Sequence, residues 1–233
     1  MRLDKFLCEM EIGTRTQVKS YIRQGLVTVN GSPAAGAQQQ INENADTVCF
    51  RGQRIVYSRF VYYMLNKPAG VVSATEDKLS PTVLGLLTAE DRRDDIFPAG
   101  RLDKDTEGFL LLTNDGELAH RLLSPKLHVD KTYLVGIEVP LSPADISALE
   151  NGVDIGDPTP TLPAVVRQTG ERSIFLTLRE GRYHQVKRML FAVGNHVTSL
   201  KRVSFGALAL DGQLAPGEYR ALTEQEVHQL YEA

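Results

Sequence analysis

The chain lacks the features that define several common classes of protein. Its 233 residues include only two cysteines and no tryptophan, and Cys8 and Cys49 form no Cys-x-x-Cys pair. A disulfide framework and a cysteine-based zinc site are therefore excluded. No apolar run approaches the roughly 18 residues that a membrane span needs, and the first ten residues carry acids where a signal peptide is apolar. We therefore expect a cytoplasmic protein without a membrane partner.

Several catalytic motifs are absent as well. The sequence contains no GxxxxGK[ST] phosphate loop, no GxGxxG, no GxSxG and no HExxH. These absences remove the usual routes to nucleotide hydrolysis, dinucleotide chemistry, serine hydrolysis and zinc proteolysis. Carboxylates, tyrosines and basic side chains remain as the groups available for chemistry.

The net charge of −3 conceals an uneven distribution. Residues 1–60 hold eight Lys or Arg against five acids, and residues 179–202 hold six against one. Two basic islands on an acidic background can form a footprint for phosphate groups. Ordinary solvated faces have the same composition, so charge alone leaves both interpretations open.

Residues 1–58 have the pattern of a small α/β module. Apolar residues at helical spacing predict a helix over 2–10, and Thr14 with Gln17 forms a capping box for a second helix that ends at Gly25. An alternating strand then ends in Asn30-Gly31, a strong hairpin signal. Short strands are expected at 46–50 and 53–58.

Residues 59–233 alternate between strand and helix patterns. Strands are expected at 61–67, 109–115, 131–139, 163–168, 173–179 and 196–206, and helices at 81–87, 114–125, 142–152, 182–195 and 223–233. Short turns join some strands and helices join others. We therefore predict an α+β domain with a mixed, largely antiparallel sheet flanked by helices.

Three helices in this segment carry specific expectations. Asn114 with Glu117 matches a capping box at the start of one helix, and Ser142 is the expected cap of the next. Tyr183 falls on the apolar stripe of helix 182–195, so we assign it to the core.

The stretch PAGRLDKDTEGFLLLTND, residues 98–115, places a knot of charges directly before an apolar strand. If residues 101–103 are extended, Arg101 and Asp103 point to the same side. Asp103 is then part of a surface salt bridge with Arg101, a general acid or base paired with Asp105 or Glu107, or a nucleophile. Spacing alone does not choose between these roles.

Resemblance to known protein families favours one of these roles for Asp103. RLDKFL, a helix bearing Arg and Lys, and GLVTVNG make residues 1–57 similar to the S4 RNA-binding domain. AGRLDKDTEGFLLLTNDGELAHRL resembles the signature of the RsuA-type pseudouridine synthases, with Phe109 where that family usually has Leu. EGRYHQVKRMLFAVGNHV, KTYLV and YYMLNKPAGVVS are similar to further motifs of the same family, in the same order.

This resemblance implies a catalytic trio. Asp103 matches the catalytic aspartate, Tyr133 the tyrosine that packs against the target base, and Lys187 the basic partner of the aspartate, which is Arg in some relatives. Without the motifs, Tyr133 would be a core residue and Lys187 a surface lysine. The implied reaction breaks the C1′–N1 bond of a uridine and rejoins the base through C5, with no metal and no cofactor. Attack by Asp103 at C6 of the base or at C1′ of the sugar remains open.

The resemblance also implies ribosomal RNA as the partner of a cytoplasmic, monomeric enzyme. Phosphate contacts are expected from basic residues of both segments, namely Arg2, Lys5, Arg15, Lys19, Arg23, Arg101, Arg182, Arg188, Lys201 and Arg202. GRYHQVKRM, GNHV and LAPGEYRALTEQE are most similar to the branch that acts on 16S rRNA, free or in an assembly intermediate. The alternatives are a 23S rRNA enzyme of the same family and a non-catalytic S4-type assembly factor. We place the S4-like domain at 1–58 and the catalytic domain at 59–233.

Overall fold

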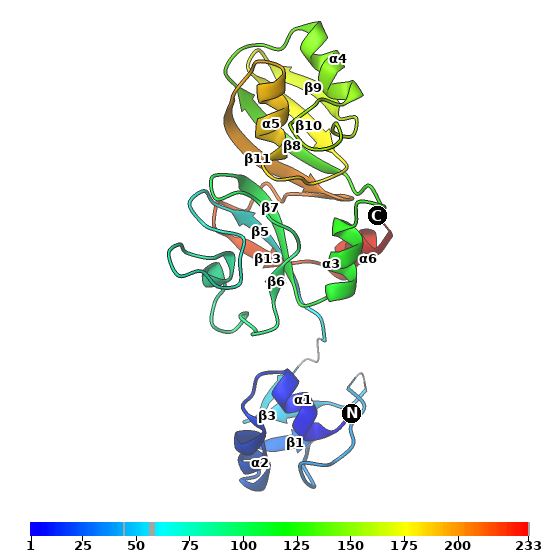
Figure 1. The fold of residues 1–233 in the computed structure, drawn as a ribbon. Coiled ribbons are helices and arrows are strands. Elements are labelled where there is room, and N and C mark those ends of the chain that lie inside the picture. Colours follow the sequence, from blue (N-terminus) through cyan, green and yellow to red (C-terminus); the bar gives the residue numbers. More distant parts are fainter. Residues whose placement is uncertain (44, 56–58, 233) are drawn as a thin grey trace. The chain divides into compact units, whose positions relative to one another are not determined.

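The computed structural model describes residues 1–43, 45–55 and 59–232, and the chain divides into two compact units, residues 1–60 and 61–233 (Figure 1). The boundary predicted from the sequence falls between residues 58 and 59, and residue 58 lies outside the described residues. The same holds for the end of the strand predicted at 53–58. Each unit is described separately below.

The first unit packs two helices against a small sheet. Its elements are α1 (Leu3–Glu9), α2 (Arg15–Arg23), β1 (Val27–Val29), β2 (Ser32–Pro33), β3 (Val48–Phe50) and β4 (Gln53–Ile55), with strand order β2-β1-β3-β4. The predicted capping box begins α2. The Thr14 side chain accepts a hydrogen bond from the Gln17 N–H, and the Gln17 side chain accepts one from the Thr14 N–H. Asn30 and Gly31 both have positive φ, as a tight hairpin between β1 and β2 requires.

The second unit is built on one nine-stranded sheet. Its strands are β5 (Tyr62–Lys67), β6 (Phe97–Pro98), β7 (Glu107–Thr113), β8 (Lys131–Ile137), β9 (Val165–Gly170), β10 (Ser173–Leu178), β11 (Val197–Phe205), β12 (Leu208–Ala209) and β13 (Tyr219–Ala221). The main order is β13-β5-β7-β11-β8-β10-β9, with β6 and β12 paired to β7 and β11. Only the β7–β11 pair is parallel among the described strands. The predicted mixed, largely antiparallel sheet is confirmed.

Helices cover both faces of this sheet (Figure 1). They are η1 (Val83–Leu86), α3 (Gly116–Leu123), α4 (Pro143–Asn151), α5 (Gln185–Ala192) and α6 (Glu224–Glu232). One face packs residues of β5, β7, β8 and β10 against η1, α4 and α5, and the other packs β5 and β7 against α3 and α6. The strands at the centre are therefore buried on both sides, which explains the continuous apolar run from Phe109 to Leu112.

The predicted N-cap of helix α3 is wrong by one residue. Asp115, not Asn114, caps α3, and its carboxylate accepts a hydrogen bond from the Leu118 backbone at 3.1 Å. The Asn114 side chain instead accepts from the Val61 backbone and donates to Asp95. Tertiary hydrogen bonds thus use the side chain that the local pattern assigned to the helix. The Ser142 cap of α4 is confirmed.

The assignment of Tyr183 to the core is also wrong. The helix begins only at Gln185, because His184 has left-handed backbone angles of φ 47° and ψ 36° that interrupt the helical run. Tyr183 is therefore outside the helix and 74% exposed.

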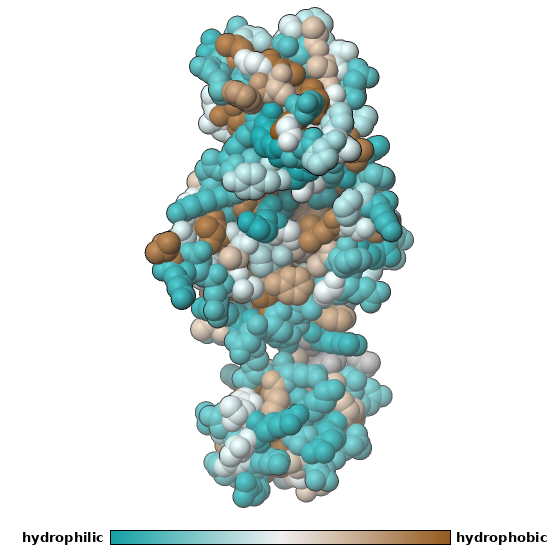
Figure 2. Space-filling model, viewed as in Figure 1, coloured by the Kyte–Doolittle hydropathy of each residue, from teal (hydrophilic) through white to brown (hydrophobic). Residues whose placement is uncertain are grey.

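Polar residues dominate the visible face of the molecule (Figure 2). Hydrophilic residues cover most of the face in Figure 2, with hydrophobic residues between them in small groups. No helix in the described part of the chain combines the length and the hydropathy needed to cross a bilayer.

Candidate active site

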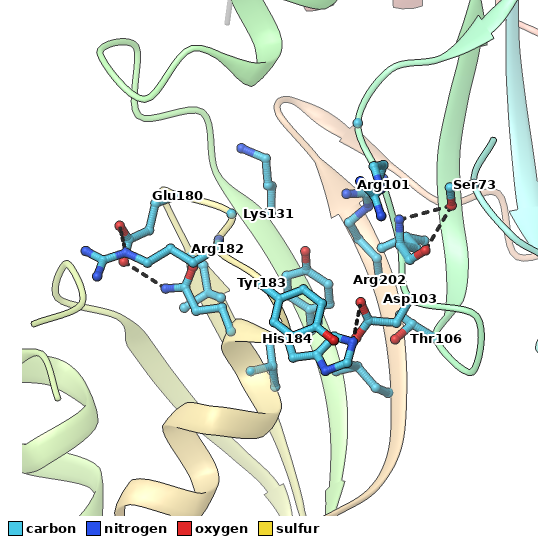
Figure 3. A pocket seen from close by; sticks show the side chains of 18 of the residues that line it. Ser73, Arg101, Asp103, Thr106, Lys131, Glu180, Arg182, Tyr183, His184 and Arg202 are labelled. Carbon is cyan, nitrogen blue, oxygen red and sulfur yellow. Dashed lines mark hydrogen bonds and ion pairs between the residues drawn. The ribbon is translucent and has the colours of Figure 1, made fainter. Parts of the chain in front are cut away.

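A pocket of about 930 Å³ opens in the second unit where the two halves of its sheet meet (Figure 3). Its wall includes the loop after β5, the segment before β7, the end of α3, the start of β8, the loop between β10 and α5 with the first turn of α5, and the middle of β11. All three residues of the predicted catalytic trio lie at or beside this pocket: Asp103 and Tyr133 line it, and Lys187 contacts Asp103. Its volume is within the range of about 300–1,000 Å³ that small-molecule sites occupy.

Asp103 lies in the extended segment that leads into β7. One carboxylate oxygen is 3.2 Å from Lys187 Nζ. The other is 3.5 Å from His184 Nε2 (Figure 3). The side chain is 26% exposed, so it is open to a ligand while the protein holds it from one side. These contacts give Asp103 partners on α5 and on the loop before it, in place of the local salt bridge with Arg101 that the sequence allowed.

Buried hydrogen bonds hold the segment that carries Asp103. Ser73 Oγ donates to the carbonyl of Leu102 at 3.0 Å and accepts from its N–H at 3.1 Å. The Lys67 ammonium, at the end of β5, is fully buried and donates to the carbonyls of Pro68, Lys104 and Thr106. Burial lowers the pKa of Lys67 to about 8. The backbone on both sides of Asp103 is thus fixed by groups that the sequence analysis did not single out.

Lys187 is shared between two carboxylates. Its Nζ lies 2.6 and 2.9 Å from the two oxygens of Asp105, closer than to Asp103. Burial disfavours its charge, but the hydrogen bonds to Asp105 and Asp103 outweigh burial and raise the pKa of Lys187 above 10.5. The same hydrogen bond lowers the pKa of Asp105. Lys187 is therefore a fixed ammonium, and Asp105 is a second partner that spacing alone did not identify.

Tyr133 lies on the buried face of β8. The strand alternates strictly between buried and half-buried residues, so Lys131, Tyr133 and Val135 share one face. Tyr133 is 9% exposed and contributes to the pocket wall. The sequence predicted this alternation, but it did not identify Lys131 as a buried residue of the site.

Arg202, expected from the sequence among the phosphate contacts, lies in the interior. It is 2% exposed on β11, directly opposite Tyr133 in the strand pairing, so any phosphate contact it makes would be inside the pocket. Its Nε donates to the Phe109 carbonyl at 2.7 Å, and its guanidinium lies over the Phe205 ring. A strand pattern does not show that a basic residue faces the interior when its partner strand is distant in sequence.

Tyr183 and His184 form a stack at the pocket. Their ring centroids are 3.9 Å apart with an interplanar angle of 18°, and both line the pocket beside Asp103 (Figure 3). The position of His184 next to Asp103 was not anticipated. A residue in the left-handed region at a candidate site is a typical place for local strain.

The remaining predicted RNA contacts differ in whether other groups of the protein already hold their side chains. The guanidinium groups of Arg182 and Arg188 are held by intramolecular bonds to backbone carbonyls and to Asp157. Arg101 is exposed at the pocket, and Lys201 is half-buried on β11. In the first unit, Arg2 pairs with Asp4 and Lys5 with Glu9. Arg15, Lys19 and Arg23 are exposed along α2.

Comparison with known proteins shows which families the chain resembles. A family model described as RNA pseudouridylate synthase matches residues 61–192, and one described as S4 domain matches residues 1–45. An uncharacterised RNA pseudouridine synthase of Bacillus subtilis, YtzG, is 52% identical over 236 residues, covering 100% of this chain and 99% of the relative. Ribosomal small subunit pseudouridine synthase A of Escherichia coli K12 is 42% identical over 229 residues, covering 97% and 98%. A crystal structure of a pseudouridylate synthase superimposes with a TM-score of 0.71 at 40% identity and covers 99% of each chain.

Proposed function

The chain belongs to the RNA pseudouridylate synthase family and is a pseudouridine synthase, and from this premise we propose that it converts one specific uridine of 16S rRNA to pseudouridine. The observation that supports the site most directly is the Asp103 carboxylate, which lines a pocket and lies 3.2 Å from a fixed ammonium. The supporting relatives include enzymes named for the small ribosomal subunit, at 42% identity over nearly the whole chain.

In this proposal Asp103 is the group that attacks the nucleotide. The Lys187 ammonium holds one oxygen of the Asp103 carboxylate, while Asp105 holds the ammonium from the other side. The other Asp103 oxygen faces His184 and the pocket. An ionised, oriented carboxylate serves equally for addition to C6 of the base and for attack at C1′ of the sugar.

The target base must leave the RNA stack to reach this carboxylate. Flipping a nucleotide costs a few kcal/mol, which contacts in the pocket must offset. Tyr133 supplies an aromatic ring in the pocket wall, and Arg202 lies opposite it on the neighbouring strand β11. We propose that the extruded uracil packs against this ring, which shields it from water while it turns.

The first unit supplies an RNA-binding surface in this proposal. Arg15, Lys19 and Arg23 recur every four residues on α2, are exposed, and so form one cationic stripe. Each cation that replaces a condensed counterion contributes about 0.7–0.9 to the slope of log K against log salt. Changing all three to Ala should therefore reduce that slope by roughly 2 to 3.

The decisive experiment maps pseudouridine in both rRNA subunits. Cells that lack the gene should lose one 16S site, and cells that carry only Asp103→Asn should lack the same site. Purified wild-type enzyme should release tritium from 16S rRNA labelled at uridine C5, because that hydrogen leaves when C5 becomes the glycosidic carbon. Restoration of the site by Asp103→Asn would refute the role of Asp103. Loss of a 23S site instead would refute the assignment to the small subunit.

Two further properties belong to the same proposal. We propose that the enzyme acts as a monomer, which light scattering of the purified protein measures. Parallel assays on naked 16S transcript and on a small-subunit assembly particle will identify which form of the RNA is the substrate.

A further inference from the structure

Two buried basic residues of the pocket wall have no acidic partner. In the part of the chain that the structure describes, Lys131 and Arg202 form no ion pair with a carboxylate. Lys131 Nζ donates to the Val129 carbonyl at 2.9 Å, and Arg202 Nε donates to the Phe109 carbonyl at 2.7 Å. One terminal nitrogen of Arg202, Nη2, is buried without any hydrogen-bond partner.

These two cations share one small region. The Lys131 ammonium is 5.4 Å and the Arg202 guanidinium 4.7 Å from the centroid of the same ring, that of Phe205. Burial, together with the charge of Arg202, lowers the pKa of Lys131 to about 8, against an opposing effect of Asp130. Asp130 itself is held by Arg179 at 3.0 Å. Two like charges therefore lie in the same part of the interior, where a hydrogen bond with Tyr133 favours the charge of Arg202 but neither base is paired with a carboxylate.

Such an arrangement is unfavourable for folding alone. A buried charge is tolerated when an opposite charge and hydrogen bonds satisfy it, and an apolar replacement is otherwise at least as stable. The Phe205 ring offsets part of the cost through cation–π contact. It leaves Nη2 of Arg202 without a partner and does not remove the repulsion between the two bases. The missing negative charge is then most simply supplied by a ligand.

The location of the pair indicates which ligand. Both residues line the pocket that holds Asp103, and both flank Tyr133, with Lys131 two residues before it on β8 and Arg202 opposite it on β11. A negative charge bound there lies beside the ring against which the uracil is proposed to pack.

We propose that Lys131 and Arg202 form an anion site in the wall of the pocket that binds a negatively charged oxygen of the RNA substrate. This inference rests on the proposed function. The RNA offers two sources of such an oxygen: the phosphate next to the flipped nucleotide, and the uracil ring, which keeps the electron pair of the C1′–N1 bond when that bond breaks and spreads the charge onto its carbonyl oxygens. In both cases the site neutralises the two buried cations only when substrate is bound.

The test compares neutral and charge-retaining variants. Lys131→Met and Arg202→Met remove the charges, while Lys131→Arg and Arg202→Lys retain them. Arg167→Met is a matched control, because Arg167 lies over the Phe175 ring at 4.9 Å in the same sheet but is exposed and not in the pocket wall. For each variant we would measure the melting temperature, the affinity for 16S rRNA at several salt concentrations, and the single-turnover rate of tritium release at saturating enzyme.

The two sources give different results. If the anion is a phosphate, the neutral variants bind RNA more weakly and their salt slope falls by about 0.7–0.9 per lost cation. If the anion is on the uracil ring, affinity and slope are unchanged and the single-turnover rate falls by about 10²-fold or more. Lys131→Arg should recover part of either loss. In both cases Lys131→Met melts at or above the wild-type temperature, which a merely structural role would not produce.

Clear outcomes overturn the inference. Folded Lys131→Met and Arg202→Met with affinity, salt slope and rate all within about twofold of wild type would exclude an anion site, since a lost charge contact costs more than that. A loss that follows only a lower melting temperature, without recovery in Lys131→Arg, would also exclude it. If Arg202→Met does not fold, Lys131→Met decides alone. Failure of the proposed function is separate, because it shows as wild-type protein that releases no tritium or as an active Asp103→Asn.

Discussion

Replacing either of two buried lysines with Met should change the stability of the protein in opposite directions, although the pKa of both is lowered to the same extent. Burial lowers the pKa of both Lys67 and Lys131 from 10.5 to about 8. At about 1.36 kcal/mol per pKa unit, this displacement disfavours each ammonium in the folded protein by roughly 3 kcal/mol. Replacement by Met removes that cost at both positions. The difference between the positions lies in the hydrogen bonds that are lost.

Lys67 makes three hydrogen bonds and Lys131 makes one. The Lys67 ammonium donates to the carbonyls of Pro68, Lys104 and Thr106, whereas the Lys131 ammonium donates only to that of Val129. Leaving a buried acceptor unsatisfied costs about 1–3 kcal/mol, so Lys67→Met loses roughly 3–9 kcal/mol and Lys131→Met roughly 1–3 kcal/mol. Set against the cost relieved, Lys67→Met should be destabilised by a few kcal/mol, and Lys131→Met should be neutral or more stable.

Urea denaturation followed by circular dichroism at neutral pH measures both changes. Lys67→Met should also lose activity under conditions where it is still folded, because the freed carbonyls belong to the segment that carries Asp103. Equal changes in the free energy of unfolding for the two variants, or a Lys67→Met protein as stable as wild type, would refute this reasoning.

Three further predictions follow from the same contacts. Because the pKa values of Lys67 and Lys131 are lowered, the unfolded chain binds more protons than the folded chain between pH 8 and 10.5. The free energy of unfolding should therefore rise above pH 8 by up to about 1.36 kcal/mol per pH unit for each lysine, until ionisation of tyrosines near pH 10 opposes the rise. A Lys67→Met protein with the full wild-type slope would contradict this. Lys187→Met should lower kcat by about 10- to 100-fold and Asp105→Asn by less, since the first leaves Asp103 without its ammonium; the reverse order in the tritium assay would assign the larger role to Asp105. Gly108→Ala should prevent stable folding, because a Cβ would lie 2.2 Å from the backbone of β11 at a φ of 101°, whereas Gly116→Ala meets no atom and should melt near the wild-type temperature.

Local signals in the sequence predicted local structure well. The Thr14–Gln17 and Ser142 caps, the Asn30-Gly31 hairpin and the end of β5 before Pro68 all depend on residues within a few positions of one another. Such contacts form wherever the chain goes, so their residue types are sufficient evidence. The family motifs added Asp103, Tyr133 and Lys187, and the structure places Asp103 and Tyr133 in the pocket wall with Lys187 against Asp103.

The errors occurred where distant segments decide the environment. The Asn114 side chain forms hydrogen bonds with Val61 and Asp95, so Asp115 caps the helix instead. Tyr183 has the right spacing for a buried stripe, but the left-handed backbone at His184 delays the helix. The burial of Arg202 was not anticipated either, because it depends on the pairing of β11 with β8 and β7. Periodicity reports which positions share a face, and it does not report what covers that face.

The parallel junction between β7 and β11 has a mechanical consequence. Asp103 is continuous with β7, whereas Tyr133 and Lys187 belong to the half of the sheet built on β8 and β11. In the part of the chain that the structure describes, two residue pairs, Lys201 with Glu107 and Arg202 with Gly108, join the two strands in register, and a shared apolar core joins the halves beside them. A rotation at this junction would draw the carboxylate away from its ammonium while each half kept its own antiparallel pairs. The alignment of the site therefore depends on this junction as well as on the stability of each half.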